Sequence, residues 1–144
     1  RTRRALPARR WRPGSDLARI FMKAPMTSSC PAQRNDPSAP ARRLCRIADI
    51  PDGGALALAG PGRPLVLVRR GDAVWGYADR CPHFSVPLAA TPGVVLTYES
   101  EVIMCAHHSA LFRFEDGHCI EGPCQGAALD RQALRIEDGC VYPA

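Results

Sequence analysis

The sequence predicts an all-β fold built from antiparallel strands. Gly and Pro number 12 and 14 among 144 residues, which favours short strands and tight turns over long helices. From residue 44 onward, short apolar segments recur, and Gly-rich turns separate them. Strands at such close spacing pair as hairpins in a small sandwich or barrel-like domain. The chain shows no βαβ pattern and no internal repeat.

Two parts of the chain differ in composition. Residues 1–43 carry eleven Lys and Arg against two Asp, a net charge of +9, whereas residues 44–144 carry a net charge of −4. The overall charge of +5 therefore describes mainly the N-terminal part. Because Arg, Pro, Ser and Ala dominate residues 1–42, we expect a disordered basic extension there. We expect the folded domain over residues 43–144.

The extension offers few specific signals. Residues 15–23 could form two helical turns, which are too few for a stable isolated helix. Met26 would be a natural start of translation. A basic arm that binds a membrane or nucleic acid is an alternative, but charge runs are usually just solvated. Binding of nucleic acid would require a basic face on the folded domain together with reading side chains, and the sequence does not indicate one.

No apolar run approaches the roughly 18 residues of a membrane span. No apolar core with a small-residue cleavage site follows the early Arg-rich stretch, as a secretory signal would need. We therefore expect a soluble, cytoplasmic protein.

The apolar segments of the domain define the expected strands. They are residues 44–47, 55–59, 65–68, 74–77, 102–104, 111–114, 119–120, 134–136 and 140–142. Three dipeptides predict tight hairpin turns between them, namely Gly71-Asp72, Asp116-Gly117 and Asp138-Gly139. Residues 91–93 and 98–101 are expected to form a surface excursion.

The candidate site consists of two short clusters in loops between these strands. The first is Cys81-Pro82-His83, and a stretch of 21 residues separates it from the second, Cys105-Ala106-His107-His108. Each cluster offers a thiolate and an imidazole. These ligands suit iron–sulfur clusters, zinc or copper, and they do not suit magnesium or calcium.

Residue chemistry alone leaves alternatives open. Zinc is one, although its ligands usually come as Cys-x2–4-Cys with His-x3–5-His. Incidental clustering is another. Within the second cluster, His107 competes with His108, and the Cys-x-x-His spacing favours His108. The other cysteines are expected to be small buried residues or inert thiols in a reduced compartment; they are Cys30, Cys45, Cys119, Cys124 and Cys140.

The paired clusters resemble the signature of Rieske [2Fe–2S] proteins, in which two Cys hold one iron and two His hold the other. The resemblance covers residues 44–144 and includes Pro87-Leu88 and the proline-containing segment 122–124. It implies a β domain of three small antiparallel sheets with two cluster-binding loops at one tip. It also implies one [2Fe–2S] cluster per chain, held by Cys81, His83, Cys105 and His108.

Departures from the family pattern narrow the subtype. Respiratory Rieske subunits carry a loop-joining disulfide where this chain has Val86 and His107, and a Ser where it has Ala110. Loss of a hydrogen-bond donor to the cluster sulfurs lowers the potential, which resembles the low-potential, ferredoxin-type branch. Ser109 replaces the usual Gly, and it strains the loop if its φ is positive.

The resemblance implies a stand-alone carrier of single electrons between a reductase and an oxygenase-type acceptor. About 100 residues leave no room for a mononuclear iron domain, so we expect no catalytic residues and no oxygenation by this chain alone. An acidic surface near the loops would steer the carrier to a basic partner; its expected members are Glu99, Glu101, Glu115, Asp116 and Glu121. The alternatives are a redox- or iron-sensing module and a non-redox module stabilised by zinc.

Overall fold

The computed structural model describes residues 42–59 and 62–144. The expected disordered extension (apart from residue 42), the short helix over residues 15–23 and Met26 lie outside the described residues. Within the described ranges, the chain forms eleven strands, one 3-10 turn (Ile47–Asp49) and no α-helix. No helix in this part of the chain is long and apolar enough to cross a membrane.

The strands form three antiparallel sheets, which confirms the predicted fold class. One sheet has the order β1-β11-β10, with bounds Cys45–Arg46, Cys140–Pro143 and Leu134–Glu137. The second has the order β2-β3-β4-β9, with bounds Ala55–Leu58, Leu65–Arg70, Ala73–Ala78 and Arg131–Gln132. The third has the order β5-β6-β7-β8, with bounds Leu96–Tyr98, Val102–Met104, Leu111–Arg113 and Cys119–Glu121.

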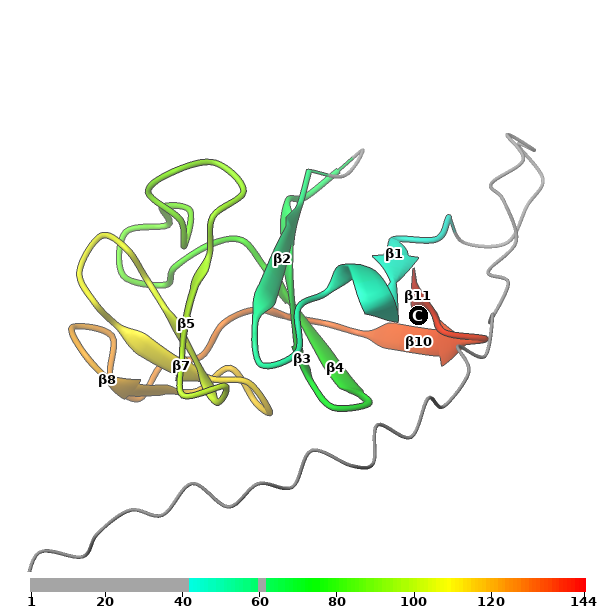
Figure 1. Ribbon diagram of the computed structural model, residues 1–144. Helices are drawn as coiled ribbons and strands as arrows, with labels where there is room; N and C mark the ends of the chain where they lie inside the picture. Colours follow the sequence, from blue (N-terminus) through cyan, green and yellow to red (C-terminus); the bar gives the residue numbers. More distant parts are fainter. Residues whose placement is uncertain (1–41, 60–61) are drawn as a thin grey trace, which may run out of the picture.

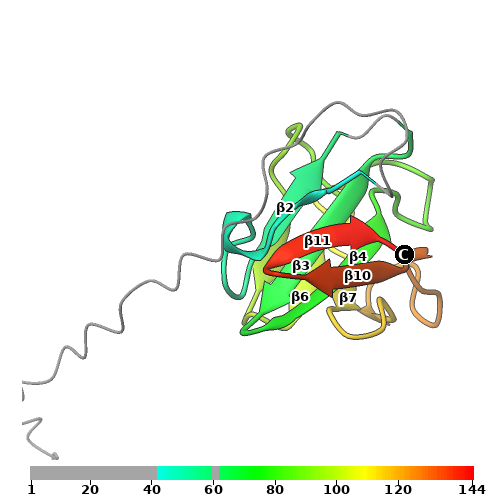
Figure 2. The same cartoon turned by 90° about the vertical axis from the view of Figure 1, so that its right-hand side faces the viewer.

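The three sheets follow one another along the molecule. In Figure 1 the sheet that contains β5, β7 and β8 lies at the left, β2, β3 and β4 lie in the middle, and β1, β10 and β11 lie at the right. In Figure 2 the C-terminal hairpin of β10 and β11 stands in front of the other strands. The hairpin thus closes the end of the molecule away from β5–β8.

Both predicted ligand clusters lie in one excursion from the middle sheet. The chain leaves this sheet at the end of β4 and returns as β9, which pairs with β4 through Gly76↔Gln132 and Tyr77↔Arg131. Close to this point the Ala78 N–H donates to the Asp130 carbonyl at 2.9 Å. Residues 79–130 therefore start and finish on neighbouring strands, and they contain β5–β8 and both clusters.

Two apolar clusters form the core. The larger lies between the middle sheet and the β5–β8 sheet and includes Val66, Phe112 and Phe114 together with Cys81 and Cys105. The smaller lies under the C-terminal hairpin and includes Ile50, Leu67 and Val141. The sulfurs of the predicted site are thus part of the core, so that the fold itself determines where they lie.

Two of the three predicted tight turns form as expected, whereas Asp116-Gly117 lies in a longer connection between Arg113 and Cys119. Gly71 has φ +60° in the two-residue loop between β3 and β4, and Asp138 and Gly139 both have positive φ between β10 and β11. Two short strands were not expected. Leu96–Tyr98 pairs with β6 and lies between the two predicted surface segments, overlapping the second only at Tyr98, and Arg131–Gln132 pairs with β4. Both strands are only two or three residues long, so tertiary pairing determines them more than local sequence does.

Candidate metal centre

The two ligand loops share one backbone arrangement. In the first loop the Cys81 N–H donates to the Val86 carbonyl at 2.7 Å, and the Ser85 N–H donates to the Cys81 carbonyl at 2.9 Å. In the second loop the Cys105 N–H donates to the Ala110 carbonyl, and the Ser109 N–H donates to the Cys105 carbonyl, both at 2.9 Å. Each cysteine thus closes a six-residue loop with both of its backbone polar groups. We call this arrangement the clasp.

Each clasp depends on a left-handed residue four positions after its cysteine. Ser85 has φ +59° and Ser109 has φ +56°. A residue with a Cβ is strained in this region by about 1–2 kcal/mol. Ser109 therefore has the positive φ for which strain in the loop was expected. The repeated Cys-x-x-x-Ser spacing was visible in the sequence, but its meaning was missed.

The clasps bring two imidazoles together at an exposed tip. The Nδ1 atoms of His83 and His108 lie 3.3 Å apart, and their rings meet edge to face with centroids 4.7 Å apart. His107 in the same clasp is exposed. The neighbouring Phe84 ring lies 4.0 Å from His83 and 5.7 Å from His108, centroid to centroid. Of the two candidates in the second cluster, His108 is the one that faces His83.

Below the imidazoles, two thiols face one another inside the core. Cys81 is 1% exposed and Cys105 is 0% exposed. Burial raises the pKa of the Cys81 thiol; the neighbouring Cys105 sulfur adds to the rise, while the His83 backbone and the Cys124 thiol act against it. A protein without metal therefore keeps this thiol protonated, and metal binding must release a proton.

The geometry fits two metals better than one. Two nitrogen ligands about 2.1 Å from a tetrahedral metal lie about 3.4 Å apart, which is close to the observed 3.3 Å between the Nδ1 atoms of His83 and His108. Across residues 42–59 and 62–144, no group of three or more His, Cys, Asp or Glu converges to hold a single ion. The site therefore presents a sulfur pair and a separate nitrogen pair. A single tetrahedral zinc needs all four at one point.

The backbone of Leu88 links the segment after the first clasp to the second clasp. Asp79 Oδ1 accepts the Leu88 N–H at 2.8 Å, and the Leu88 carbonyl accepts the Ala106 N–H at 2.8 Å. Leu88 itself is fully buried in the core. The second clasp is therefore positioned by the segment that follows the first.

Comparison with protein families decides what this site is. Residues 41–135 match the model of the Rieske [2Fe-2S] domain. The chain belongs to the Rieske [2Fe–2S] domain family. Its cofactor is therefore a [2Fe–2S] cluster, as the resemblance implied. The comparison with curated proteins gave no match.

Solved structures share this Rieske fold. The ferredoxin of Sphingomonas yanoikuyae B1 has 24% identity and a TM-score of 0.59, and the alignment covers 72% of this chain and 97% of the ferredoxin. The terminal oxygenase of carbazole 1,9a-dioxygenase from Novosphingobium sp. KA1 has 26% identity and a TM-score of 0.58, with 73% and 28% covered. The reduced complex between oxygenase and ferredoxin in carbazole 1,9a-dioxygenase has 24% identity and a TM-score of 0.60, with 71% and 27% covered. This chain thus spans only about a quarter of the oxygenase chains that it matches.

The proline-containing segment of the Rieske domain lies against the second clasp. Gly122 has φ +108°, and a Cβ placed there would lie 2.7 Å from the Ala110 Cα. The segment thus approaches the clasp more closely than any other residue type would allow. Two residues later, Cys124 lies beside Cys81 and Cys119. Burial, reinforced by these two sulfurs, raises the pKa of Cys124 to about 12.

The cysteines outside the ligand loops largely match the expectation of inert buried residues. Cys45, Cys119 and Cys124 are buried free thiols, and burial raises the pKa of Cys45 to about 11. The expectation of an inert thiol was wrong for Cys140, which is buried but forms a disulfide bond. Cys30 lies outside the described residues.

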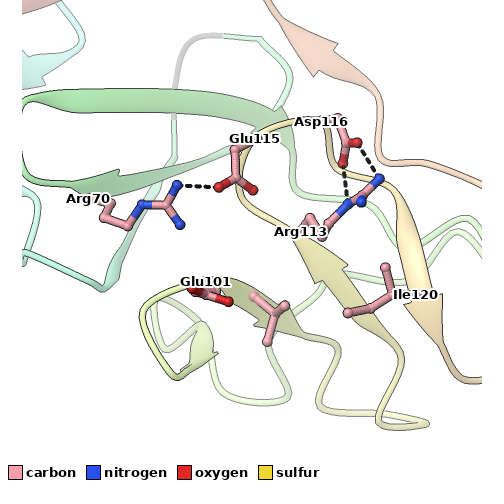
Figure 3. Close-up of a pocket in the computed structure, with 7 residues that line it drawn as sticks. Arg70, Glu101, Arg113, Glu115, Asp116 and Ile120 are labelled. Atoms are coloured by element: carbon pink, nitrogen blue, oxygen red, sulfur yellow. Dashed lines mark hydrogen bonds and ion pairs between the residues drawn. The ribbon is translucent and has the colours of Figure 1, made fainter.

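A surface pocket of the Rieske domain lies away from the metal centre. The residues of two ion pairs, Arg70–Glu115 and Arg113–Asp116, line it, and Figure 3 shows both pairs. The second clasp joins β6 to β7 at Met104 and Leu111, and the pocket contains Val102 and Arg113 at the opposite ends of the same strands. The pocket therefore contributes nothing to the centre.

The same register corrects the expected acidic surface near the loops. Four of its five members lie in turns at the end of β6 and β7 that is far from the second clasp, and they are Glu99, Glu101, Glu115 and Asp116. Only Glu121, which pairs with Leu111, lies at the clasp end. Sequence proximity to the loops was misleading because each strand carries the chain from one end of the sheet to the other.

Proposed function

We propose that Cys81, His83, Cys105 and His108 hold the [2Fe–2S] cluster and that the domain passes single electrons from a reductase to an oxygenase-type acceptor. One observation carries the assignment: a buried sulfur pair lies below an exposed nitrogen pair, with 3.3 Å between the His83 and His108 Nδ1 atoms. When bound, the cluster supplies a reversible one-electron couple. Everything else in the proposal concerns what the chain does around it.

The chain holds the two pairs in different environments. The cysteine sulfurs are enclosed by the core, which excludes water from one side of the centre. His108 is exposed and His83 is half-buried, so the imidazole side faces solvent. An electron therefore has a short route to a partner through the imidazole side only.

Phe84 is the exposed apolar residue at this tip. It is 67% exposed, and its ring rests on His83. Aromatic side chains, Phe among them, are enriched in the cores of protein interfaces. We propose that the electron acceptor receives Phe84 in an apolar recess beside the imidazoles.

Charge contributes less to this docking than the sequence suggested. Four of the five acidic side chains expected near the loops lie at the far end of the β5–β8 sheet, and Glu115 and Asp116 are already paired with arginines. At the tip, the exposed Arg80 donates to Ser85 Oγ at 2.8 Å. A strongly basic partner surface is therefore not required for recognition.

The neighbouring structures support an oxygenase acceptor. One of them is a ferredoxin, and another is a complex of an oxygenase with a ferredoxin. The described domain resembles the ferredoxin over almost its whole length, with 97% of that chain covered. A separate carrier is thus the best interpretation of the domain.

The ligand assignment is tested with a matched pair of histidine variants. His108→Ala should abolish the visible absorption of the cluster and its reduced EPR signal, because one iron loses a ligand. His107→Ala should retain two iron and two sulfide per chain. A colourless, iron-free wild-type protein that is fully folded would refute the proposal, as would a normal chromophore in His108→Ala.

Electron transfer is tested with reduced protein and an oxidised oxygenase component of the aromatic ring-hydroxylating class, by stopped-flow recovery of the absorption. Phe84→Ala should slow the transfer about tenfold, as for loss of one interface anchor. Tyr98→Ala is the control, because Tyr98 is also exposed but lies toward the far end of the sheet. Equal rates for both variants would exclude Phe84 as the contact.

A further inference from the structure

Four cysteine sulfurs form a connected group at the centre of the molecule. Cys81, Cys105, Cys119 and Cys124 belong to one buried cluster, and Cys105 and Cys124 are the side chains that act on the Cys81 thiol. Cys124 in turn donates to Cys119 Sγ at 3.4 Å. Only Cys81 and Cys105 are used as ligands in the proposed function. The other two thiols are buried beside them without an assigned role.

The protons of this group can be followed from bond to bond. The Cys119 thiol donates to the Glu121 carbonyl at 3.2 Å, which commits its single proton. Cys119 Sγ is then available only as an acceptor. The Cys124 thiol therefore has one proton and two possible acceptors, which are Cys119 Sγ and Cys81 Sγ.

The choice between these acceptors depends on charge. A thiolate that ligates a metal carries negative charge, whereas Cys119 is a neutral thiol. Hydrogen bonds to charged acceptors are roughly twice as strong as those between neutral groups. With Cys81 as a thiolate, the proton of Cys124 moves from the Cys119 side to the Cys81 side.

The backbone holds Cys124 where this bond can form. The Ala127 N–H donates to the Cys124 carbonyl at 2.9 Å, and the Gln125 N–H donates to the Gly122 carbonyl at 3.3 Å. Gly122 rests against the backbone of the second clasp at Ala110. Ala110 has no side-chain donor of its own, so Cys124 is the side-chain donor that the described structure brings to the ligand sulfurs.

We propose that the Cys124 thiol donates a hydrogen bond to the Cys81 ligand sulfur and thereby raises the reduction potential of the cluster. The inference rests on the proposed ligand assignment and concerns a positioning residue that does not itself bind iron. A donor to a ligand sulfur stabilises the reduced cluster more than the oxidised one, because the reduced cluster has one more negative charge. Cys119 assists by orienting the thiol before the metal binds.

The test compares reduction potentials of cluster-loaded variants, measured by redox titration of the visible absorption. Cys124→Ala should raise the ratio of oxidised to reduced cluster at a fixed potential by about three- to tenfold, a tenfold change being about 59 mV for one electron. Cys124→Ser keeps a donor and should stay within about twofold of wild type. Cys119→Ala leaves Cys81 as the only acceptor and should not lower the potential.

A second readout separates a hydrogen bond from a packing effect. In the wild type, transfer to deuterated buffer should shift the Fe–S(Cys) stretching frequencies in resonance Raman spectra, and this shift should decrease in Cys124→Ala. Cys45→Ala is the matched control, since Cys45 is buried in the other apolar cluster. It should change neither measurement.

The outcomes distinguish the inference from the proposed function. If the wild type has no cluster, the ligand assignment fails. If all variants carry two iron and two sulfide but Cys124→Ala has the wild-type potential, the inference alone is overturned. It is also overturned if Cys119→Ala lowers the potential as much as Cys124→Ala, because the cause would then be loss of packing.

Discussion

The two ligand loops have the same clasp but different supports. In the first loop, Arg80 bonds the Ser85 hydroxyl, and Asp79 bonds the backbone of Leu88. In the second loop, Ser109 is exposed and the clasp rests on Leu88 and on Gly122. The first loop thus contains its own side-chain supports, while the second is positioned by its neighbours. One backbone design therefore serves two loops of unequal independence.

This difference implies that the second loop depends on the first more than the first depends on the second. A change in the first loop that moves Leu88 should disturb both ligand pairs, whereas a change in the second clasp should leave the first largely intact. Four predictions test or refine this asymmetry, and they run from the largest expected effect to the smallest.

Leu88→Ala should have the largest effect. Leu88 is fully buried, and its truncation should destabilise the domain by about 2–5 kcal/mol. It should also accelerate release of iron well below the unfolding temperature, since both clasps depend on this segment. Leu129→Ala removes a buried leucine of the same core cluster and serves as the control. Equal rates of iron release in the two variants would contradict a special role of Leu88.

Gly122→Ala should come next. The added Cβ would meet the Ala110 backbone at 2.7 Å in a residue with φ +108°, and we expect a cost of about 2–4 kcal/mol. Gly126→Ala in the same segment has φ +90° but open space around the Cβ, so only strain of about 1 kcal/mol remains. Thermal unfolding followed by circular dichroism measures both. Equal losses would show that the segment does not press on the second clasp.

Ser109→Gly should stabilise the domain. Relief of the left-handed strain, less the extra flexibility of Gly in the unfolded chain, leaves a gain of about 0.5–1 kcal/mol. Ser85→Gly should have almost no effect, because it also removes the hydrogen bond from Arg80. A difference of a few degrees in unfolding temperature is expected for a domain of about this size. A larger gain at Ser85 would reverse the comparison of the two loops.

Asp116→Asn should have the smallest effect and should spare both loops. The hydrogen bond from the His118 N–H, followed by Arg113, lowers the pKa of Asp116. The carboxylate therefore stabilises the folded state at pH values above the ordinary pKa of 3.8. This stabilisation is lost as the pH falls through the lowered pKa. Because the pair is half-exposed, we expect less than about 1 kcal/mol at neutral pH. Urea unfolding of both proteins should differ at neutral pH and converge in acid. A difference that persists in acid would mean that charge is not the cause.

The parts of the fold that depend on local chemistry could be predicted from the sequence. Gly71-Asp72 and Asp138-Gly139 make the expected turns because positive φ is a property of the residues themselves. The strand Arg131–Gln132 could not be predicted, because it exists only through its partner β4. The acidic turns were misplaced for a related reason, since strand register decides at which end of a sheet a turn lies.

The site shows the same division. The residue types and spacing of Cys81, His83, Cys105 and His108 indicated the family, and the structure pairs the two imidazoles and buries both thiols in one core cluster. The strain at Ser85 depends on a backbone angle that the sequence does not specify. The contact between Cys124 and Cys81 spans 43 positions of the chain and results from tertiary packing.

The excursion over residues 79–130 leaves and rejoins the middle sheet on adjacent strands. We call a unit attached in this way a cassette. Its length can change without moving its two points of attachment on the middle sheet, because these lie on paired strands. Evolution can vary such a cassette while the scaffold stays constant.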